Sequence, residues 1–530
     1  MIPYKAPLRD MRFLLNEVLD FPAHYATLPG GNDADTETVN AILEGAAQLC
    51  EDVLAPLNQS GDLEGCSFTQ GTVSTPKGFK EAYQQFQAGG WQSISFPAEF
   101  GGQGLPASLN LFKSEMMGTA NWSFSMYPGL SMGCINTLLR YGTATQKKQY
   151  LPKLISGEWS GTMCLTEPHC GTDLAQITTK AVPQSDGSYS LTGTKIFISA
   201  GEHDLTDNIV HIVLARLPDA PEGTRGISLF VVPKFNVEGD ESNAVIGKRN
   251  SVHCGSIEHK MGIRASATAL LNFDAAKGHL ISEPNRGLEA MFTFMNTARL
   301  GTAVQGVCHA EAAFQGALPY AQERRSMRAL SGKKEPTQKA DALIWHPDVR
   351  RMLLTQKAIA EGGRHMIYDA LKIADHMFHA SSVGDEDGYK KHYTDLGFFT
   401  PILKGFLTEL GLEAANLGMQ VFGGHGYIQE HGMEQNVRDA RIATLYEGTT
   451  GIQALDLLGR KVLLGSKGQC VRDFTFKMLQ FARPKLLEGG VNGSMARTLT
   501  WKAIEWNLMT LAIMLRAPKD RELVGSASVD

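Results

Sequence analysis

The chain has 530 residues, which is too long for one simple core and predicts two to four domains. Hydrophobic residues make up 43% and charged residues 20%, as in an ordinary soluble globular protein. The net charge of −5, from 50 basic and 55 acidic residues, gives no general attraction to nucleic acid or to an anionic membrane.

Neither a targeting segment nor a membrane span is expected. The amino-terminal sequence MIPYKAPLRDMRFLL is not a signal peptide, because Arg9, Asp10 and Arg12 interrupt its apolar run. No stretch of about 18 uncharged apolar residues occurs. The eight cysteines form no C-x-x-C pair and the fifteen histidines no H-E-x-x-H, so neither disulfides nor a metal site are expected. These features predict a soluble, cytoplasmic protein.

Residues 1–158 are predicted to form a helical domain. Asp35 opens an Asp-Thr-Glu-Thr capping sequence, and Val39, Leu43 and Ala46 follow at helical spacing. The glycine-rich segment 96–105 interrupts this pattern with a turn before the helical pattern resumes.

Residues 159–282 change to short runs of β type, separated by glycine and proline turns. Together they predict a small β-barrel or β-sandwich domain, with runs at 188–192, 195–199, 208–216, 226–232 and 269–273. The connection 236–255 is polar and contains glycine, which predicts a long exposed loop.

From residue 283 the apolar period returns to 3.6, which predicts a helical bundle over 283–465 and a further helical segment over 466–530. In the bundle, Leu403, Phe406, Leu407, Leu410, Ala414 and Leu417 share one predicted buried face. Residues 331–338 are expected to be a loop between two long helices, and Pro319 is expected to kink or break its helix.

The run 441–453, Arg-Ile-Ala-Thr-Leu-Tyr-Glu-Gly-Thr-Thr-Gly-Ile-Gln, places one carboxylate, Glu447, between an apolar stretch and a glycine turn. A carboxylate held against apolar neighbours has a raised pKa and can act as a base near neutral pH. Taken alone, the same residues are also typical of a surface glutamate in a loop.

Two further segments can bind a ligand through their backbone. In 163–173, Met-Cys-Leu-Thr-Glu-Pro-His-Cys-Gly-Thr-Asp, a strand leads into a turn whose N–H groups and hydroxyls can bond the edge of a flat ring or a phosphate. In 420–427, Gln-Val-Phe-Gly-Gly-His-Gly-Tyr, glycines after an apolar helix let the backbone approach a ligand closely. By themselves, Thr-Glu-Pro is a common loop and Gly-Gly a common helix end.

Together and in this order, the three segments resemble the acyl-CoA dehydrogenases, flavoenzymes that remove the α proton of a CoA thioester and pass the β hydride to FAD. The resemblance covers nearly the whole chain and implies that family's fold: a helical N-terminal domain, a middle β-domain and a C-terminal four-helix bundle. It implies Glu447 as the catalytic base, because the second position used in the family holds Ala298 here. The Glu447 backbone N–H and a flavin hydroxyl are the implied donors to the enolate oxygen.

The same resemblance implies a flavin site built from several segments. Its expected cofactor-binding residues are Met163, Leu165, Thr166, Gly171, Thr172, Phe197, Ile198, Ser199, Arg324, Ser326, Gln420, Gly423, Gly424 and Thr449. In the family, the positions of Arg324 and 420–424 belong to the neighbouring subunit, so a homo-oligomer, at least a dimer, is expected. An electron-transfer flavoprotein is the expected electron acceptor. His169, Cys170 and Met327 depart from the family pattern.

For the substrate, the resemblance implies contacts from Thr172, Asn296, Arg299 and Gly448. Segments 156–162, 344–350 and 446–453 are similar to a larger bacterial branch that converts 3-(methylthio)propanoyl-CoA to 3-(methylthio)acryloyl-CoA in dimethylsulfoniopropionate degradation. Another short or medium-chain acyl-CoA stays an alternative. Met126, Tyr127 and Leu130 are pocket candidates, with plain core residues as the alternative.

Two other activities on this fold are alternatives. An acyl-CoA oxidase uses the same base and flavin but passes electrons to oxygen. A DNA-binding relative has a basic C-terminal domain, whereas this chain is net acidic and has only short basic runs after Glu447. The sequence ends with Gly525-Ser-Ala-Ser-Val-Asp530, where the branch usually continues, so a truncated or unusually short member is expected.

Overall fold

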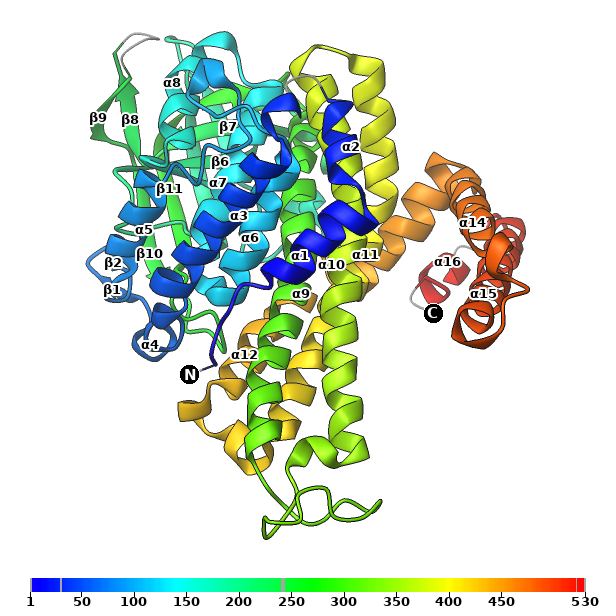
Figure 1. Ribbon diagram of the computed structural model, residues 1–530. Helices are drawn as coiled ribbons and strands as arrows, with labels where there is room; N and C mark the ends of the chain where they lie inside the picture. Colours follow the sequence, from blue (N-terminus) through cyan, green and yellow to red (C-terminus); the bar gives the residue numbers. More distant parts are fainter. Residues whose placement is uncertain (1, 29–30, 240–243, 521, 529–530) are drawn as a thin grey trace.

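The structure, a computed structural model, describes residues 2–28, 31–239, 244–520 and 522–528. It has a helical N-terminal part, a β-rich middle part and a helical C-terminal part in that order (Figure 1). The last two residues of the predicted chain end at 525–530 lie outside the described residues.

The N-terminal part is helical, as predicted. Its helices are α1 (Leu8–Phe13), α2 (Phe21–Ala26), α3 (Thr36–Leu49), α4 (Pro56–Glu64), α5 (Phe79–Ala88), α6 (Ala107–Ala120), α7 (Trp122–Tyr141) and α8 (Ala144–Ile155). The Asp35 cap is confirmed, because its carboxylate accepts a hydrogen bond of 2.7 Å from the Thr38 N–H.

One segment of this part is not helical. Residues 67–74 form an antiparallel hairpin of β1 (Ser67–Thr69) and β2 (Thr72–Ser74). Gln70 and Gly71 make its turn with positive φ angles of 49° and 83°, which a continuing helix cannot contain.

The middle part is a barrel. Its strands are β3 (Trp159–Cys164), β4 (Lys180–Pro183), β5 (Tyr189–Ser199), β6 (Asn208–Arg216), β7 (Ile227–Pro233), β10 (Val252–Ile257) and β11 (Thr268–Ile281). The pairing runs β4–β5–β11–β7–β6 and returns to β4, which closes the sheet; β3 adds to β6 in parallel and β10 to β11. Closure removes the exposed edges of these five strands.

The predicted long loop 236–255 is wrong in part. Its described residues form a hairpin of β8 (Phe235–Glu238) and β9 (Val245–Arg249) and begin β10, whereas residues 240–243 lie outside the described residues. The β9 side chains are largely exposed, so the hairpin has no apolar face, and the alternation that marks a strand in a sequence is missing.

Three long helices, α9 (Gly287–Glu323), α10 (Pro347–Ser382) and α11 (Glu386–Phe422), pack against one another in the C-terminal part (Figure 1). The helix α9 runs past Pro319 without a break, and the loop predicted at 331–338 lies between α9 and α10. Leu403 and Leu407 are buried as predicted, but Phe406 is 52% exposed, because the buried face of α11 is centred on Lys404, Leu407 and Thr408.

An interrupted helix takes the fourth position of this bundle. It consists of α12 (Met433–Arg441) and α13 (Thr450–Leu455), which both pack on α11. The interruption between them carries Glu447. Beyond it, α14 (Gln469–Ala482), α15 (Gly490–Arg516) and α16 (Glu522–Ser526) stand to one side of the bundle (Figure 1). Within the described ranges, no helix is long and apolar enough to cross a membrane.

Candidate active site

A cavity of about 560 Å³ lies among α6, α7, α9, α10 and α11, and the predicted turn 96–105 covers part of it. Met126 and Leu130 of α7 line this cavity, as does Ala298 of α9. Tyr127 does not; it is buried, and its hydroxyl donates a hydrogen bond of 3.1 Å to the Ala265 carbonyl. Two of the three pocket candidates therefore face the cavity, and the third is a core residue.

Glu447 also lines the cavity, from the interruption of the fourth bundle helix. Its φ is +57° and that of the following Gly448 is +87°. A left-handed conformation at a residue with a side chain costs free energy of about 1–2 kcal/mol and persists only where surrounding contacts enforce it. Such a strained residue beside a cavity indicates a functional position.

Two side chains enforce the backbone around Glu447. The Gln453 side-chain amide donates to the Glu447 carbonyl at 2.9 Å and to the Gly448 carbonyl at 3.2 Å. The Lys404 ammonium donates to the Gly448 carbonyl at 2.6 Å. Neither residue was predicted from the sequence. A lysine within the apolar face of α11 was the available signal, because a buried charge needs a partner.

Burial raises the pKa of the Glu447 carboxyl to about 7, although the positive charges of Arg299 and Lys404 act in the opposite direction. At neutral pH the carboxylate is therefore about half ionised, and it can accept a proton of a bound ligand. This is the electrostatic behaviour that the sequence pattern at 441–453 predicts.

Arg299 and Asn296 lie on α9 near this carboxylate but differ in orientation. Asn296 lines the cavity and donates a hydrogen bond of 3.0 Å to the Tyr393 hydroxyl. Arg299 is buried against Asp456, at 3.1 Å, and is not among the residues that line the cavity. Its buried Nε–H has no partner within the described ranges.

Tyr446 lines the cavity next to Glu447. Its hydroxyl donates to the Gln305 side-chain oxygen and approaches the Met126 sulfur at 3.9 Å. Burial raises its pKa far from neutrality, so the phenol stays protonated and acts as a donor.

Residues 165–166 and 195–199 lie side by side at the barrel surface. The Ile196 N–H donates to the Thr166 carbonyl at 2.9 Å, which joins the turn after β3 to the end of β5. Phe197 has a φ of +58° and is 59% exposed, whereas Ile198 is buried. Within the described part of the chain, the Thr166 and Ser199 hydroxyls make no hydrogen bond. Leu165, Met163 and the cavity residue Leu130 belong to one apolar cluster; Gly171 and Thr172 are exposed.

Glu167 fixes the geometry of this turn. Its buried carboxylate pairs with the buried Lys195 ammonium at 2.9 Å and accepts four hydrogen bonds from the N–H groups and hydroxyls of Thr178 and Thr179. Lys195 also donates to the Leu165 carbonyl at 2.9 Å. Neither Glu167 nor Lys195 was predicted from the sequence to have a role.

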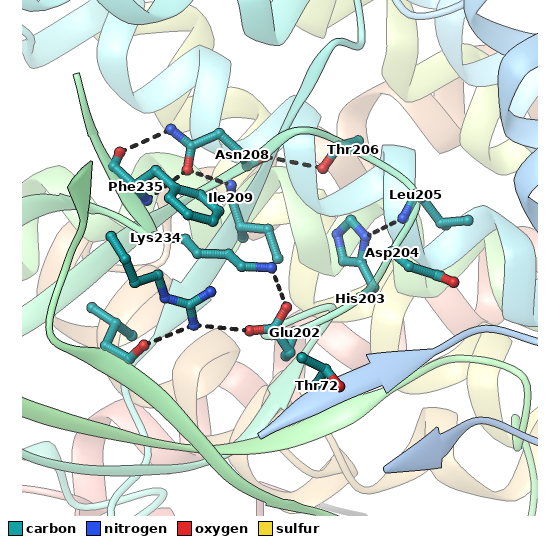
Figure 2. A network of polar contacts seen from close by, with 12 residues as sticks. Thr72, Glu202, His203, Asp204, Leu205, Thr206, Asn208, Ile209, Lys234 and Phe235 are labelled. Carbon is teal, nitrogen blue, oxygen red and sulfur yellow. Dashed lines mark hydrogen bonds and ion pairs between the residues drawn. The ribbon is translucent and has the colours of Figure 1, made fainter. Parts of the chain in front are cut away.

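A second polar network holds the chain that follows Ser199. The two carboxylate oxygens of Glu202 bind two cations, Lys234 and Arg249. Figure 2 shows the contact between Glu202 and Lys234. Beside it, the Asn208 side chain bonds to the backbone of Phe235 through both its amide and its oxygen. The connection from β5 to β6 is therefore tied to β8 and β9.

The remaining expected cofactor residues lie at the other end of the bundle. Arg324 follows α9, and Gln420, Gly423 and Gly424 end α11, where Tyr320 stacks on Phe422 at 4.0 Å. Tyr446, next to Glu447 in the chain, contacts Gln305 of α9. An α-helix rises about 1.5 Å per residue, so Arg324 is roughly 30 Å along α9 from this level. One chain does not bring the two groups together.

Several of these distal groups are open to solvent. Arg324 is exposed, and its guanidinium makes no hydrogen bond or ion pair with any residue that the structure describes. A Cβ on Gly423 or on Gly424 would meet nothing within 4 Å. Ser326 is also exposed at this end, whereas Thr449 lies beside Glu447, where its hydroxyl caps α13 by accepting from the Ile452 N–H.

Comparison with known proteins places this geometry in context. The N-terminal, middle and C-terminal domain models of acyl-CoA dehydrogenases match residues 36–158, 162–276 and 285–463. The chain is 46% identical over 491 residues to 3-methylmercaptopropionyl-CoA dehydrogenase from Ruegeria pomeroyi, which covers 92% of this chain and 81% of that protein. It is 33% identical over 498 residues to a butyryl-CoA dehydrogenase from Syntrophomonas wolfei, with 91% and 79% covered. The structure of butyryl-CoA dehydrogenase from Megasphaera elsdenii superposes with a TM-score of 0.65 at 25% identity, covering 80% of this chain and 98% of that one.

Proposed function

The chain belongs to the acyl-CoA dehydrogenase family, and from this premise we propose that it oxidises 3-(methylthio)propanoyl-CoA to 3-(methylthio)acryloyl-CoA. The reaction removes one hydrogen from Cα and one from Cβ of the thioester and leaves a trans double bond. The single observation that supports the chemistry is the state of Glu447. Its backbone is strained, its carboxyl lies on the cavity wall, and burial raises the pKa of that carboxyl to about 7.

Glu447 takes the α proton in this proposal. The α proton of a thioester is a far weaker acid than a carboxylic acid, so the site must also stabilise the negative charge that develops on the thioester oxygen. The Glu447 backbone N–H is the protein donor assigned to that oxygen, and the clamp formed by Lys404 and Gln453 keeps the backbone at this position fixed. The neutral Tyr446 hydroxyl and the apolar α7 side chains limit water beside the reacting carbon.

The residues of the barrel fit a flavin. A flat ring needs an apolar surface and hydrogen-bond partners at its polar edge, and the exposed Phe197 ring and the unbonded Thr166 and Ser199 hydroxyls supply both. We assign Leu165, Thr166, Phe197 and Ser199 to the ring. FAD, when bound there, supplies the acceptor for the β hydride.

We further propose that the pyrophosphate and adenine of FAD are bound by a second copy of the chain. The exposed, unpaired Arg324 guanidinium suits a pyrophosphate, and the open backbone at 423–424 allows close approach of a ligand. Because these groups lie roughly 30 Å along α9 from the base, a homodimer is the smallest assembly that completes the site. Transfer of electrons to an electron-transfer flavoprotein and a cytoplasmic location are part of the same proposal.

The substrate assignment rests on the 46% identical relative from Ruegeria pomeroyi, whereas the other relatives named above act on butyryl-CoA. A short acyl group is common to both. We also propose the domain limits 1–158, 159–282, 283–465 and 466–530. The boundaries fall between α8 and β3, between β11 and α9, and before α14.

The test is anaerobic reduction of the bound flavin by a panel of acyl-CoAs, followed by flavin absorbance. We expect 3-(methylthio)propanoyl-CoA to bleach the flavin faster than butyryl-CoA or octanoyl-CoA. Glu447→Gln keeps size and hydrogen bonding but cannot accept a proton, so bleaching should slow by about 10²–10⁴-fold or more while flavin content is retained. Bleaching of the Glu447→Gln protein at nearly the wild-type rate would mean that another group is the base, and the proposal would be withdrawn.

A further inference from the structure

Lys404 is a buried cation that contacts the loop of the base. It lies on α11 with no exposed surface, although lysine is almost never fully buried without a charged partner. Its ammonium donates to the Gly448 carbonyl at 2.6 Å, immediately after Glu447 in the chain. No carboxylate forms an ion pair with it among the described residues, so its position is set by a backbone carbonyl.

The conformation that Lys404 holds is strained. The strain lies at Glu447, which carries a side chain at a φ of 57°, whereas Gly448 adopts its φ of 87° without steric cost. A loop in this conformation relaxes unless its carbonyls are bound. Gln453 binds the same two carbonyls, so the Gly448 carbonyl accepts from two side chains on different elements, α11 and α13.

We infer that Lys404 is a positioning residue of the reaction: it holds Glu447 at the cavity and favours the ionised carboxylate by its charge. This rests on the proposed role of Glu447 as the base. Lys404 does not touch the substrate in this inference and acts only through the loop of the base.

The charges around Glu447 support the electrostatic part of this inference. Arg299 on α9 and Lys404 on α11 are the two cations that stabilise its carboxylate, and Asp456 neutralises Arg299 at 3.1 Å. Glu409 acts on Lys404 but is bound to the Thr450 hydroxyl at 2.6 Å. Burial lowers the pKa of Lys404 to about 8, against the effect of the Glu447 charge. Within the described ranges, Lys404 thus differs from Arg299 in that it forms no ion pair with a carboxylate.

The main variant is Lys404→Met, which removes the donor and the charge but keeps the length of the side chain. The flavin is reduced anaerobically by 3-(methylthio)propanoyl-CoA between pH 5.5 and 9.5, and the midpoint of the rate profile is measured. An opposite charge nearby shifts a carboxyl pKa by about 1–3, so we expect the midpoint to rise by about one pH unit. The ionised fraction at pH 7, and with it the rate, should fall by about fivefold from this shift alone. A rate deficit that persists at high pH measures the loss of positioning.

Two matched variants separate charge from geometry. Gln453→Met removes a donor to the same carbonyls without a change of charge, so we expect a slower rate with an unmoved midpoint. Lys260→Met is the control for a partly buried lysine bound to a backbone carbonyl, because its ammonium donates to the Ser266 carbonyl at 2.7 Å and its charged neighbours include Asp439 and Asp62 but not Glu447. We expect lower thermal stability with an unmoved midpoint. In Lys404→Arg the charge remains and the donor is displaced, so the midpoint should stay and the rate should fall.

The charge effect also has a readout that needs no turnover. In protein labelled with ¹³C at glutamate carboxyls, the signal absent from Glu447→Gln should titrate about one pH unit higher in Lys404→Met than in wild type. An unmoved midpoint in Lys404→Met, or one that moves no more than in Lys260→Met, would overturn the inference. If Lys404→Met does not fold, the rate of Lys404→Arg tests the positioning role. A wild-type rate in Lys404→Arg would overturn that role. Both results leave the proposed function standing as long as Glu447→Gln is inactive.

Discussion

Glu167→Gln should destabilise the barrel strongly, although the change removes only one charge. The Glu167 and Lys195 side chains are 2% and 0% exposed, and the carboxylate also accepts from Thr178 and Thr179. Burial alone would raise the pKa of Glu167, but Lys195 and these donors lower it from 4.5 to about 2. Each pKa unit is about 1.4 kcal/mol, so the lowered pKa of the Glu167 carboxyl corresponds to about 3 kcal/mol of stability at neutral pH. Burial lowers the pKa of Lys195, which opposes part of this stabilisation. Removal of one partner of a buried pair costs about 3–5 kcal/mol, which is consistent with this value.

The sign of the pH dependence follows from the lowered pKa. The contribution is complete above the unfolded value of about 4.5 and is lost as the pH falls toward 2. Urea unfolding at pH 7, followed by barrel tryptophan fluorescence, measures the free-energy change. Because Lys195 also holds the Leu165 carbonyl, we expect weaker flavin retention in the same variant.

Two comparisons make this prediction refutable. Asp186→Asn breaks an ion pair with Lys277 in the same barrel, but the two side chains are 55% and 47% exposed, so we expect a much smaller loss of stability than for Glu167→Gln. The double variant Glu167→Gln with Lys195→Met leaves no uncompensated charge and should recover part of the lost stability. A loss for Glu167→Gln as small as that for Asp186→Asn would refute the reasoning.

Three further predictions follow from the site. The rate of flavin reduction should rise with pH through about 7 and be lost below it, because burial raises the pKa of Glu447 to that value and only the ionised form is a base; a rate independent of pH from 5.5 to 8 would contradict this. Arg324→Ala should weaken FAD retention without unfolding the protomer, and a wild-type monomer with full flavin by light scattering would contradict the shared site. Mass spectrometry of the released cofactor should show FAD, because FMN lacks the pyrophosphate that Arg324 is proposed to bind.

The sequence predicted the features that depend on local patterns. Alternating and 3.6-residue periods located the barrel and the bundle, and the Asp35 cap was placed correctly. The acyl-CoA dehydrogenase fold was recognised from three short segments. The hairpin β8–β9 was missed because a strand exposed on both faces has no apolar alternation. The face of α11 was misplaced at Phe406, since the packing partners that define a buried face are not visible in one helix.

The motifs of the candidate site could be found in the sequence. The side chains that hold those motifs in place could not. The neighbours of Glu447 in the chain marked it as a candidate, and the family resemblance assigned it the role of base. Its clamp joins Lys404 to a carbonyl 44 positions later, and a side chain bound to a distant carbonyl leaves no local pattern. The Glu167–Lys195 pair spans 28 positions and was missed for the same reason.

The length of α9 has a genetic consequence if the site is shared. Each site would take Glu447 from one chain and Arg324 from the other, because within one chain Arg324 lies roughly 30 Å along α9 from the level of Glu447. Chains carrying only Glu447→Gln and chains carrying only Arg324→Ala are each defective as homodimers. Co-expressed, they form mixed dimers in which one site collects both substitutions and the other collects neither. Two inactive alleles would then complement each other and restore one intact active site in every mixed dimer.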